Sequence, residues 1–118
     1  MVEIKIITDN KLLSVLGAQE GEQLFAAFEN GELIGLCKYR LAGRTVLLLD
    51  LQERNGDLLL ADGIARAAIS SCEGLADRVQ CEKAGVLPAF MASSGWFDRD
   101  GQADLKKVLK GKCSHQRD

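Results

Sequence analysis

Hydrophobic and charged residues alternate at the start of the chain. Val2, Ile4 and Ile6 are separated by Glu3 and Lys5, which is the period-two pattern of a strand with one solvent-facing side. We expect this strand to lie at an edge of a sheet. Residues 12–16 are mostly apolar and precede a glycine, and this predicts a short helix with a glycine exit.

The next apolar segments predict an antiparallel hairpin. Asn30-Gly31 lies between the apolar segments 23–28 and 33–39, and Asn-Gly adopts the positive φ angles of a type I′ turn at low cost. A second turn at Ala42-Gly43 leads into residues 45–51, which are nearly all apolar and do not alternate. That pattern predicts a central strand covered on both faces.

A helical period follows from residue 57. Asp57 can act as its N-cap, and Gly74 supplies the left-handed residue beyond its C-terminal end. Gly63 inside the helix costs about 1 kcal/mol relative to alanine, so we expect close packing there. The apolar positions recur every three or four residues and are Leu60, Ile64, Ala67, Ala68 and Cys72.

The last third of the chain predicts one more strand and two helices. Residues 78–82 alternate again, and the order strand, helix, strand predicts a parallel pairing with the central strand. Residues 87–94 and 103–110 are the expected helices. The fold class predicted is α/β (α+β), a single domain over residues 1–111 with a flexible tail at 112–118. Its sheet is expected to be mixed and mostly antiparallel, with a central parallel pair flanked by helices.

Composition and charge limit the kinds of partner and the cellular compartment that we expect for this chain. The chain has 118 residues, 47% hydrophobic and 27% charged, as expected of one globular domain. The net charge of -2, with scattered basic residues, argues against nucleic acid. The first ten residues contain no long apolar stretch, so we expect no signal peptide, no membrane anchor and a cytoplasmic location. Without a C-x-x-C pair, buried reduced thiols are expected at Cys37, Cys72, Cys81 and Cys113.

This order of elements, closing on Ser94-Gly95-Trp96-Phe97, resembles a reduced member of the GNAT N-acetyltransferase superfamily over roughly residues 23–97. The resemblance implies that the central strand and the following loop and helix bind the pantetheine and diphosphate of acetyl-CoA. A glycine-containing loop at a helix N-terminus is also, on physical grounds, an anion site. The cofactor-binding residues implied are Leu49, Leu51, Arg54, Asn55, Gly56, Asp57 and Leu58.

The loop departs from the pattern of the superfamily, which is Arg or Gln, two residues, Gly, one residue, then Gly or Ala. The nearest match, residues 53–58, keeps only Gly56, and an alignment over residues 56–61 ends on a small residue but has Leu59 in place of the glycine. Glu53 and Asp57 add two carboxylates, and an Asp57 N-cap competes for the same amides. A capped helix start without a ligand is therefore an equally good interpretation.

The candidate catalytic residue is Asp50, the only acidic side chain within the central strand. It would take a proton from the attacking amine, and the alternative is a structural carboxylate bonded to backbone or to Arg44. Many members of the superfamily have a tyrosine acid on the closing helix, where this chain has Met91. Cys37 and Cys81 are interpreted as buried core residues rather than as nucleophiles.

Three functions remain open from the sequence. The first is an acetyl-CoA-dependent N-acetyltransferase acting on an unidentified small-molecule or protein amine. The second is a catalytically inactive GNAT-fold protein that binds another ligand or partner. The third is a structural module that forms a homodimer through an exposed edge of the hairpin.

Overall fold

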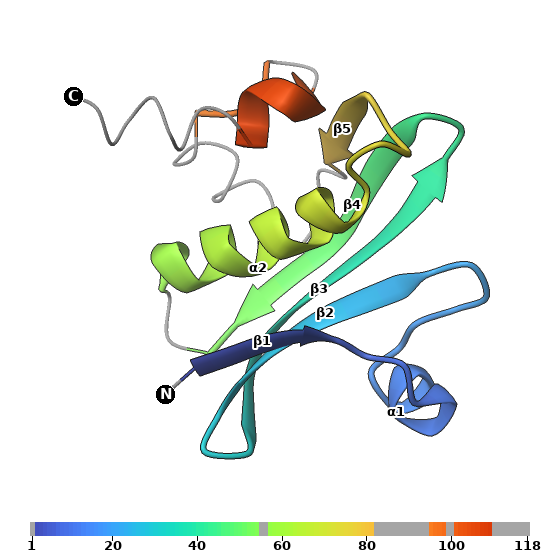
Figure 1. Cartoon of the computed structure of the whole chain (residues 1–118). Helices are drawn as coiled ribbons and strands as arrows, with labels where there is room; N and C mark the ends of the chain where they lie inside the picture. The colour runs from blue at the N-terminus through green and yellow to red at the C-terminus, as the bar shows by residue number, and fades with distance from the viewer. Residues whose placement is uncertain (1, 55–56, 82–94, 99–100, 110–118) are drawn as a thin grey trace.

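A single six-stranded sheet organises the molecule, and one long helix lies across one of its faces (Figure 1). The computed structural model describes residues 2–54, 57–81, 95–98 and 101–109. The helices are α1 (Asn10–Val15) and α2 (Leu58–Ser71), and residues 105–109 are also helical. The strands are β1 (Val2–Ile6), β2 (Gln23–Glu29), β3 (Glu32–Ala42), β4 (Thr45–Glu53), β5 (Arg78–Cys81) and β6 (Gln102–Asp104).

The strands lie in the sheet in the order of the sequence, β1 to β6. Each neighbouring pair is antiparallel except β4 and β5, which are parallel and connected through α2. The predicted mixed, mostly antiparallel sheet with one parallel pair is confirmed, and so is the edge position of β1. The β2–β3 hairpin lies inside the sheet, between β1 and β4. The hypothesis of a homodimer through a hairpin edge is therefore wrong.

Local sequence explains where the elements begin and end. Asn30 and Gly31 have φ angles of 52° and 83°, as a two-residue hairpin turn requires. Asp57 is the N-cap of α2, and its carboxylate accepts from the N–H groups of Leu59 and Leu60 at 3.0 and 3.1 Å. Gly74 has a φ angle of 88° just beyond the helix end. These predicted signals are confirmed.

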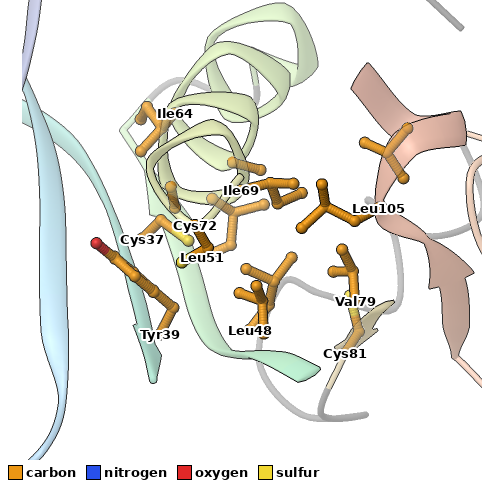
Figure 2. Close-up of a cluster of buried hydrophobic side chains, with 14 of the residues drawn as sticks. Cys37, Tyr39, Leu48, Leu51, Ile64, Ile69, Cys72, Val79, Cys81 and Leu105 are labelled. Carbon is orange, nitrogen blue, oxygen red and sulfur yellow. The ribbon is translucent and has the colours of Figure 1, made fainter. Parts of the chain in front are cut away.

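The main core lies between α2 and one face of the sheet. Figure 2 shows Cys37, Leu48 and Leu51 from the strands close to Ile64 and Ile69 of α2. A smaller cluster on the other face joins Leu24, Ala26 and Leu36 of the sheet to Leu13 of α1 and to Leu16, the C-cap of that helix. Strand β4 is fully buried only on the α2 face, because its opposite-facing residues are half-buried. The expectation of full cover on both faces is wrong.

The C-terminal prediction of a helix over 103–110 needs a correction. Residues 102–104 form β6, which pairs antiparallel with β5, and helical structure begins only at residue 105. Asp104 caps that helix by accepting from the N–H groups of Lys106 and Lys107 at 2.9 and 3.3 Å. A three-residue strand is too short to show a period in sequence. The predicted helix over 87–94 and the tail at 112–118 lie outside the described residues.

The glycine that packs closely is not the one predicted. A Cβ at Gly63 would lie 3.5 Å from Ile4 Cδ1, an ordinary contact, whereas a Cβ at Gly35 would lie 2.8 Å from Ile64 Cδ1. The close approach is therefore on β3, where the sheet meets α2.

Three cysteines, Cys37, Cys72 and Cys81, are buried free thiols, as predicted. Burial is the main cause that raises the pKa of the Cys37 and Cys72 thiols, so both stay protonated and inert as nucleophiles near neutral pH. Cys113 lies outside the described residues. Within the described ranges, no helix combines the length and apolar character that a membrane crossing requires.

Candidate functional site

In the part of the chain that the structure describes, β5 pairs only with the first half of β4. The parallel pairing runs from Thr45 with Arg78 to Leu48 with Cys81, whereas β4 continues to Glu53. Residues 49–53 therefore extend past the last described residue pair with β5. Among the described residues, no strand pairs with this side of β4 beyond Leu48, and this is the side where the pantetheine contacts are expected.

A β-bulge lies at the same point of β4. Lys38 pairs with Asp50 and Tyr39 pairs with Leu48, so Leu49 is an extra residue opposite β3. A bulge leaves its extra residue out of the ladder and increases local twist. The inward alternation shifts with it, since Val46 and Leu48 are followed by Leu51 as the next fully buried residue. The backbone of Leu49 therefore lies outside the ladder with β3, one residue beyond the last described pair between β4 and β5.

The backbone of Leu51 is oriented toward the same open side. Arg54 donates its N–H to the Ile34 carbonyl at 2.9 Å, and in this register the ladder residues on β4 that bond to β3 are the even-numbered ones. The N–H of Leu51 therefore points away from β3, while its side chain is buried under α2. Contact of the backbone groups of Leu49 and Leu51 with pantetheine stays a prediction.

Asp50 already uses both carboxylate oxygens. Oδ1 accepts from the Leu51 N–H at 2.9 Å, and Oδ2 accepts from Gln52 Nε2 at 2.6 Å. The predicted alternative of a backbone-bonded carboxylate describes this geometry. Arg44 is not its partner, because Arg44 forms a two-fold hydrogen-bonded pair with Asp77 at 2.7 and 2.9 Å. The carboxylate nevertheless reaches the open side of β4.

The loop before α2 is lined by two acidic side chains. Glu53 Oε1 accepts from the Asp57 N–H at 2.6 Å, and Asp57 in turn caps the first turn of α2. Backbone N–H groups at a helix N-terminus are the donors that bind a diphosphate. Here the N–H groups of Asp57, Leu59 and Leu60 bond to these carboxylates instead. Asn55 and Gly56 lie outside the described residues, as does the side chain of Leu58.

Arg54 is the cation of this loop. Its Nη1 lies 3.0 Å from Glu32 Oε1, and both side chains are more than half exposed. An ion pair this exposed contributes about 1 kcal/mol or less. Arg54 can therefore leave Glu32 for a stronger anion at small cost.

A shallow hollow adjoins the loop, between the start of β3 and the end of β4. It has a volume of about 200 Å³ and is lined by residues 33–36 and 52–54. Gly35 contributes no side chain to it, and Gln52, Glu53 and Arg54 contribute its polar groups. Sequence reasoning assigned no role to the Gln52 or Glu32 side chain and missed the hollow. A glycine inside a strand pattern, as at Gly35, is the signal that could have indicated a close approach there.

The segment of residues 95–98 packs against the main core. Trp96 and Phe97 are half-buried against it. The Arg66 guanidinium lies 4.3 Å from the Trp96 ring centre and donates to the Val108 carbonyl at 2.6 Å. Met91, at the position of the expected acid, lies outside the described residues.

Comparison with known proteins identifies the fold. No protein-family model and no curated protein matches the chain. Among solved structures, a putative GNAT-family acetyltransferase from Desulfovibrio desulfuricans superimposes with a TM-score of 0.70 at 12% identity, over 89% of this chain and 99% of that one. A GNAT-family acetyltransferase from Elizabethkingia anophelis with acetyl-CoA bound gives 0.61 at 11%, over 82% and 76%.

A putative N-acetyltransferase from Escherichia coli bound to coenzyme A gives a TM-score of 0.63 at 17% identity, over 88% of this chain and 97% of that one. Identities this low carry information about fold and not about chemistry. The chain has the GNAT fold, which confirms the resemblance inferred from the order of its elements.

Proposed function

We propose that this GNAT-fold chain binds acetyl-CoA beside the free half of β4 and transfers the acetyl group to an amine of an unidentified small molecule or protein. The observation that carries the proposal is the bulge at Leu49, which lies just beyond Leu48, the last residue of β4 that pairs with β5 among the described residues. Two proteins of the same fold, cited above, were solved with acetyl-CoA or coenzyme A bound.

Pantetheine is a chain of amides, and amides bind an open strand by backbone hydrogen bonds. Leu49 and Leu51 would supply those bonds, because the bulge and the ladder register turn their backbone groups away from β3. The Leu51 N–H would exchange its hydrogen bond to Asp50 Oδ1 for one to the ligand. In this proposal the ligand lies alongside β4 beyond Leu48, the last residue that pairs with β5 among the described residues.

The diphosphate would lie at the loop that leads into α2. Residues Arg54, Asn55, Gly56, Asp57 and Leu58 are proposed to surround it, with Arg54 as the cation. Because the Glu53 carboxylate bonds to the Asp57 N–H at 2.6 Å, it would have to swing out for the phosphate to replace it. We therefore expect weak binding of the cosubstrate.

The transfer itself needs a positioned, deprotonated amine. Its nitrogen attacks the thioester carbonyl, the C–S bond breaks, and the CoA thiolate leaves and takes up a proton. Asp50 is the proposed acceptor of the amine proton, since its carboxylate reaches the side of β4 that faces the ligand. The hydrogen bond from Gln52 Nε2 at 2.6 Å would hold that carboxylate in place.

A second function is favoured by one observation. The N–H groups of Asp57, Leu59 and Leu60 are bonded to carboxylates of the chain itself. A protein that binds no diphosphate would have this arrangement. The second candidate is therefore a catalytically inactive GNAT-fold protein that binds another ligand or partner.

Release of the free CoA thiol distinguishes the acetyltransferase from the catalytically inactive protein. The chain is incubated with acetyl-CoA and, in turn, a polyamine, free amino acids and peptides with free N-termini. The proposal predicts amine-dependent thiol release that falls at least about ten-fold in Asp50→Asn, while Glu73→Gln, beyond the far end of α2, keeps the rate. Coenzyme A binding without release for any amine would support the inactive candidate.

A further inference from the structure

The outer edge of the sheet at β1 offers unpaired backbone groups. In the part of the chain that the structure describes, β2 is the only strand that pairs with β1. The Ile7 N–H donates to the Leu24 carbonyl at 2.9 Å, in the register that pairs Ile6 with Phe25. Antiparallel ladders alternate, so residues 3, 5 and 7 bond to β2. The backbone groups of Val2, Ile4 and Ile6 therefore point outward.

At the opposite edge of the sheet, by contrast, the outward backbone groups of Gln102 in β6 have partners. Strand β6 is bordered by Asp98, whose N–H donates to the Gln102 carbonyl at 2.9 Å and whose Oδ1 accepts from the Gln102 N–H at 3.0 Å. Natural sheets protect their edges in this way. The difference between the two edges singles out β1 as the surface for association.

We propose that β1 pairs with β1 of a second copy of this chain, antiparallel and centred on Ile4, to form a homodimer with a continuous sheet. In this register Ile4 pairs with Ile4 of the second copy, and Val2 pairs with Ile6 of the second copy. All these residues direct their backbone groups outward, so each such pair exchanges two hydrogen bonds. The interface is symmetric, as a two-fold dimer requires.

Charge complementarity selects this register. Glu3 falls opposite Lys5 of the second copy, and Lys5 falls opposite Glu3, at the non-hydrogen-bonded positions where facing side chains are closest. Both side chains are accessible, because they are 66% and 55% exposed. They meet each other along their own strand at 3.6 Å, and the Lys5 ammonium also lies 5.2 Å from the Phe28 ring centre. Pairing across the two-fold axis would give each charge a second partner of opposite sign.

The apolar side chains of β1 support the same partner. Val2 and Ile6 are 43% and 42% exposed and lie on the face of β1 that also carries Ile4, which packs against the main core under α2. Two-fold pairing would place Val2 of each copy beside Ile6 of the other. One five-residue edge buries less than the roughly 1,000 Å² of a stable interface, so the dimer would be weak and concentration-dependent.

The test uses two single charge reversals and their mixture. Lys5→Glu brings four acidic side chains together at the seam, and Glu3→Lys brings four basic ones. Each variant alone should dimerise at least about ten-fold more weakly than the wild type. In an equimolar mixture, however, the acidic strand faces the basic strand, and dimers should return. A change in the folding of each chain cannot produce that recovery.

Sedimentation velocity from micromolar to millimolar protein measures the result against the 12.8 kDa monomer. The proposal is supported if the wild type and the mixture move toward twice that mass while the single variants do not. It is overturned by a wild type that stays monomeric at millimolar concentration, or by a mixture that behaves like its two components.

A proline variant tests the backbone part of the proposal. Ile6→Pro removes an N–H that points outward and leaves the ladder with β2 intact, so it should abolish the dimer and keep the far-UV circular dichroism of the wild type. If Ile6→Pro folds and dimerises as well as the wild type, β1 is not the interface. Coenzyme A binding is measured on the same samples and does not decide this outcome, because the edge and the acyl-transfer site are separate.

Discussion

The Glu53 carboxylate accepts a hydrogen bond from the Asp57 N–H at 2.6 Å, between the end of β4 and the start of α2. An acidic side chain of the chain itself thus takes a donor at the place where the fold would put a phosphate. Asp57 repeats the arrangement with the N–H groups of Leu59 and Leu60. If the chain binds coenzyme A as proposed, the affinity depends on how readily these carboxylates exchange their hydrogen bonds for those of the phosphate.

Replacing Glu53 should strengthen binding of coenzyme A. Glu53→Gln removes a negative charge that lies within hydrogen-bonding distance of the loop, and at high effective dielectric such a charge is worth about 1 kcal/mol, or about five-fold in affinity. Isothermal titration with coenzyme A measures the change. Glu73→Gln, which removes the same charge beyond the other end of α2, is the matched control. Equal affinities for both variants would place the diphosphate elsewhere.

Replacing Arg54 should weaken the same binding. The Arg54 guanidinium is held only by Glu32, at 3.0 Å in an exposed pair, and is the cation of the proposed diphosphate site. We expect Arg54→Ala to lower the affinity about five- to ten-fold, as loss of one charge-assisted hydrogen bond does. Arg40→Ala, an exposed arginine on β3, controls for overall charge. An Arg54→Ala affinity equal to that of the control contradicts the assignment.

Two glycine-to-alanine substitutions should change stability in opposite directions. A Cβ at Gly35 would meet Ile64 Cδ1 at 2.8 Å and the Gln52 carbonyl at 3.0 Å, so Gly35→Ala should destabilise by about 1–3 kcal/mol. A Cβ at Gly63 would find Ile4 at 3.5 Å, so Gly63→Ala should stabilise α2 by up to about 1 kcal/mol. Urea unfolding measures both free energies. The same sign for both variants would refute this packing.

The ion pair between Arg44 and Asp77 should make the stability of the fold depend on pH in the acidic range. The hydrogen bond from Arg44 is the main cause that holds the pKa of the Asp77 carboxyl below its usual value. A lowered pKa contributes stability above the unfolded value of about 4, and this contribution is lost as the pH falls through the folded value. The Tm difference between the wild type and Asp77→Asn should therefore shrink between about pH 6 and about pH 3. A constant difference over that range would show that the pair contributes nothing.

Much of the fold could be predicted because its signals are local. Asn30-Gly31 marks the hairpin within two residues, and Asp57 marks the start of α2 through its own N-cap. The parallel pairing of β4 and β5 followed from the helix that connects them. Each of these predictions depends on residues that are close in sequence.

The features that the sequence did not predict depend on contacts between residues that are distant in sequence. Leu49 lies in a uniformly apolar segment, and its role as a bulge is defined only by the register with β3. Arg44 pairs with Asp77, 33 residues away, rather than with the nearer Asp50. The close approach at Gly35 is created by Ile64 of α2. Periodicity and propensity carry no information about such contacts.

Titration of the wild-type chain with acetyl-CoA and with coenzyme A tests the central claim most directly. The account predicts saturable heat with both ligands at micromolar to millimolar concentration, together with a rise in Tm, because binding to the folded chain stabilises it. Absence of both heat and thermal shift at millimolar ligand would contradict the account and leave a GNAT fold that serves a purpose other than acetyl transfer.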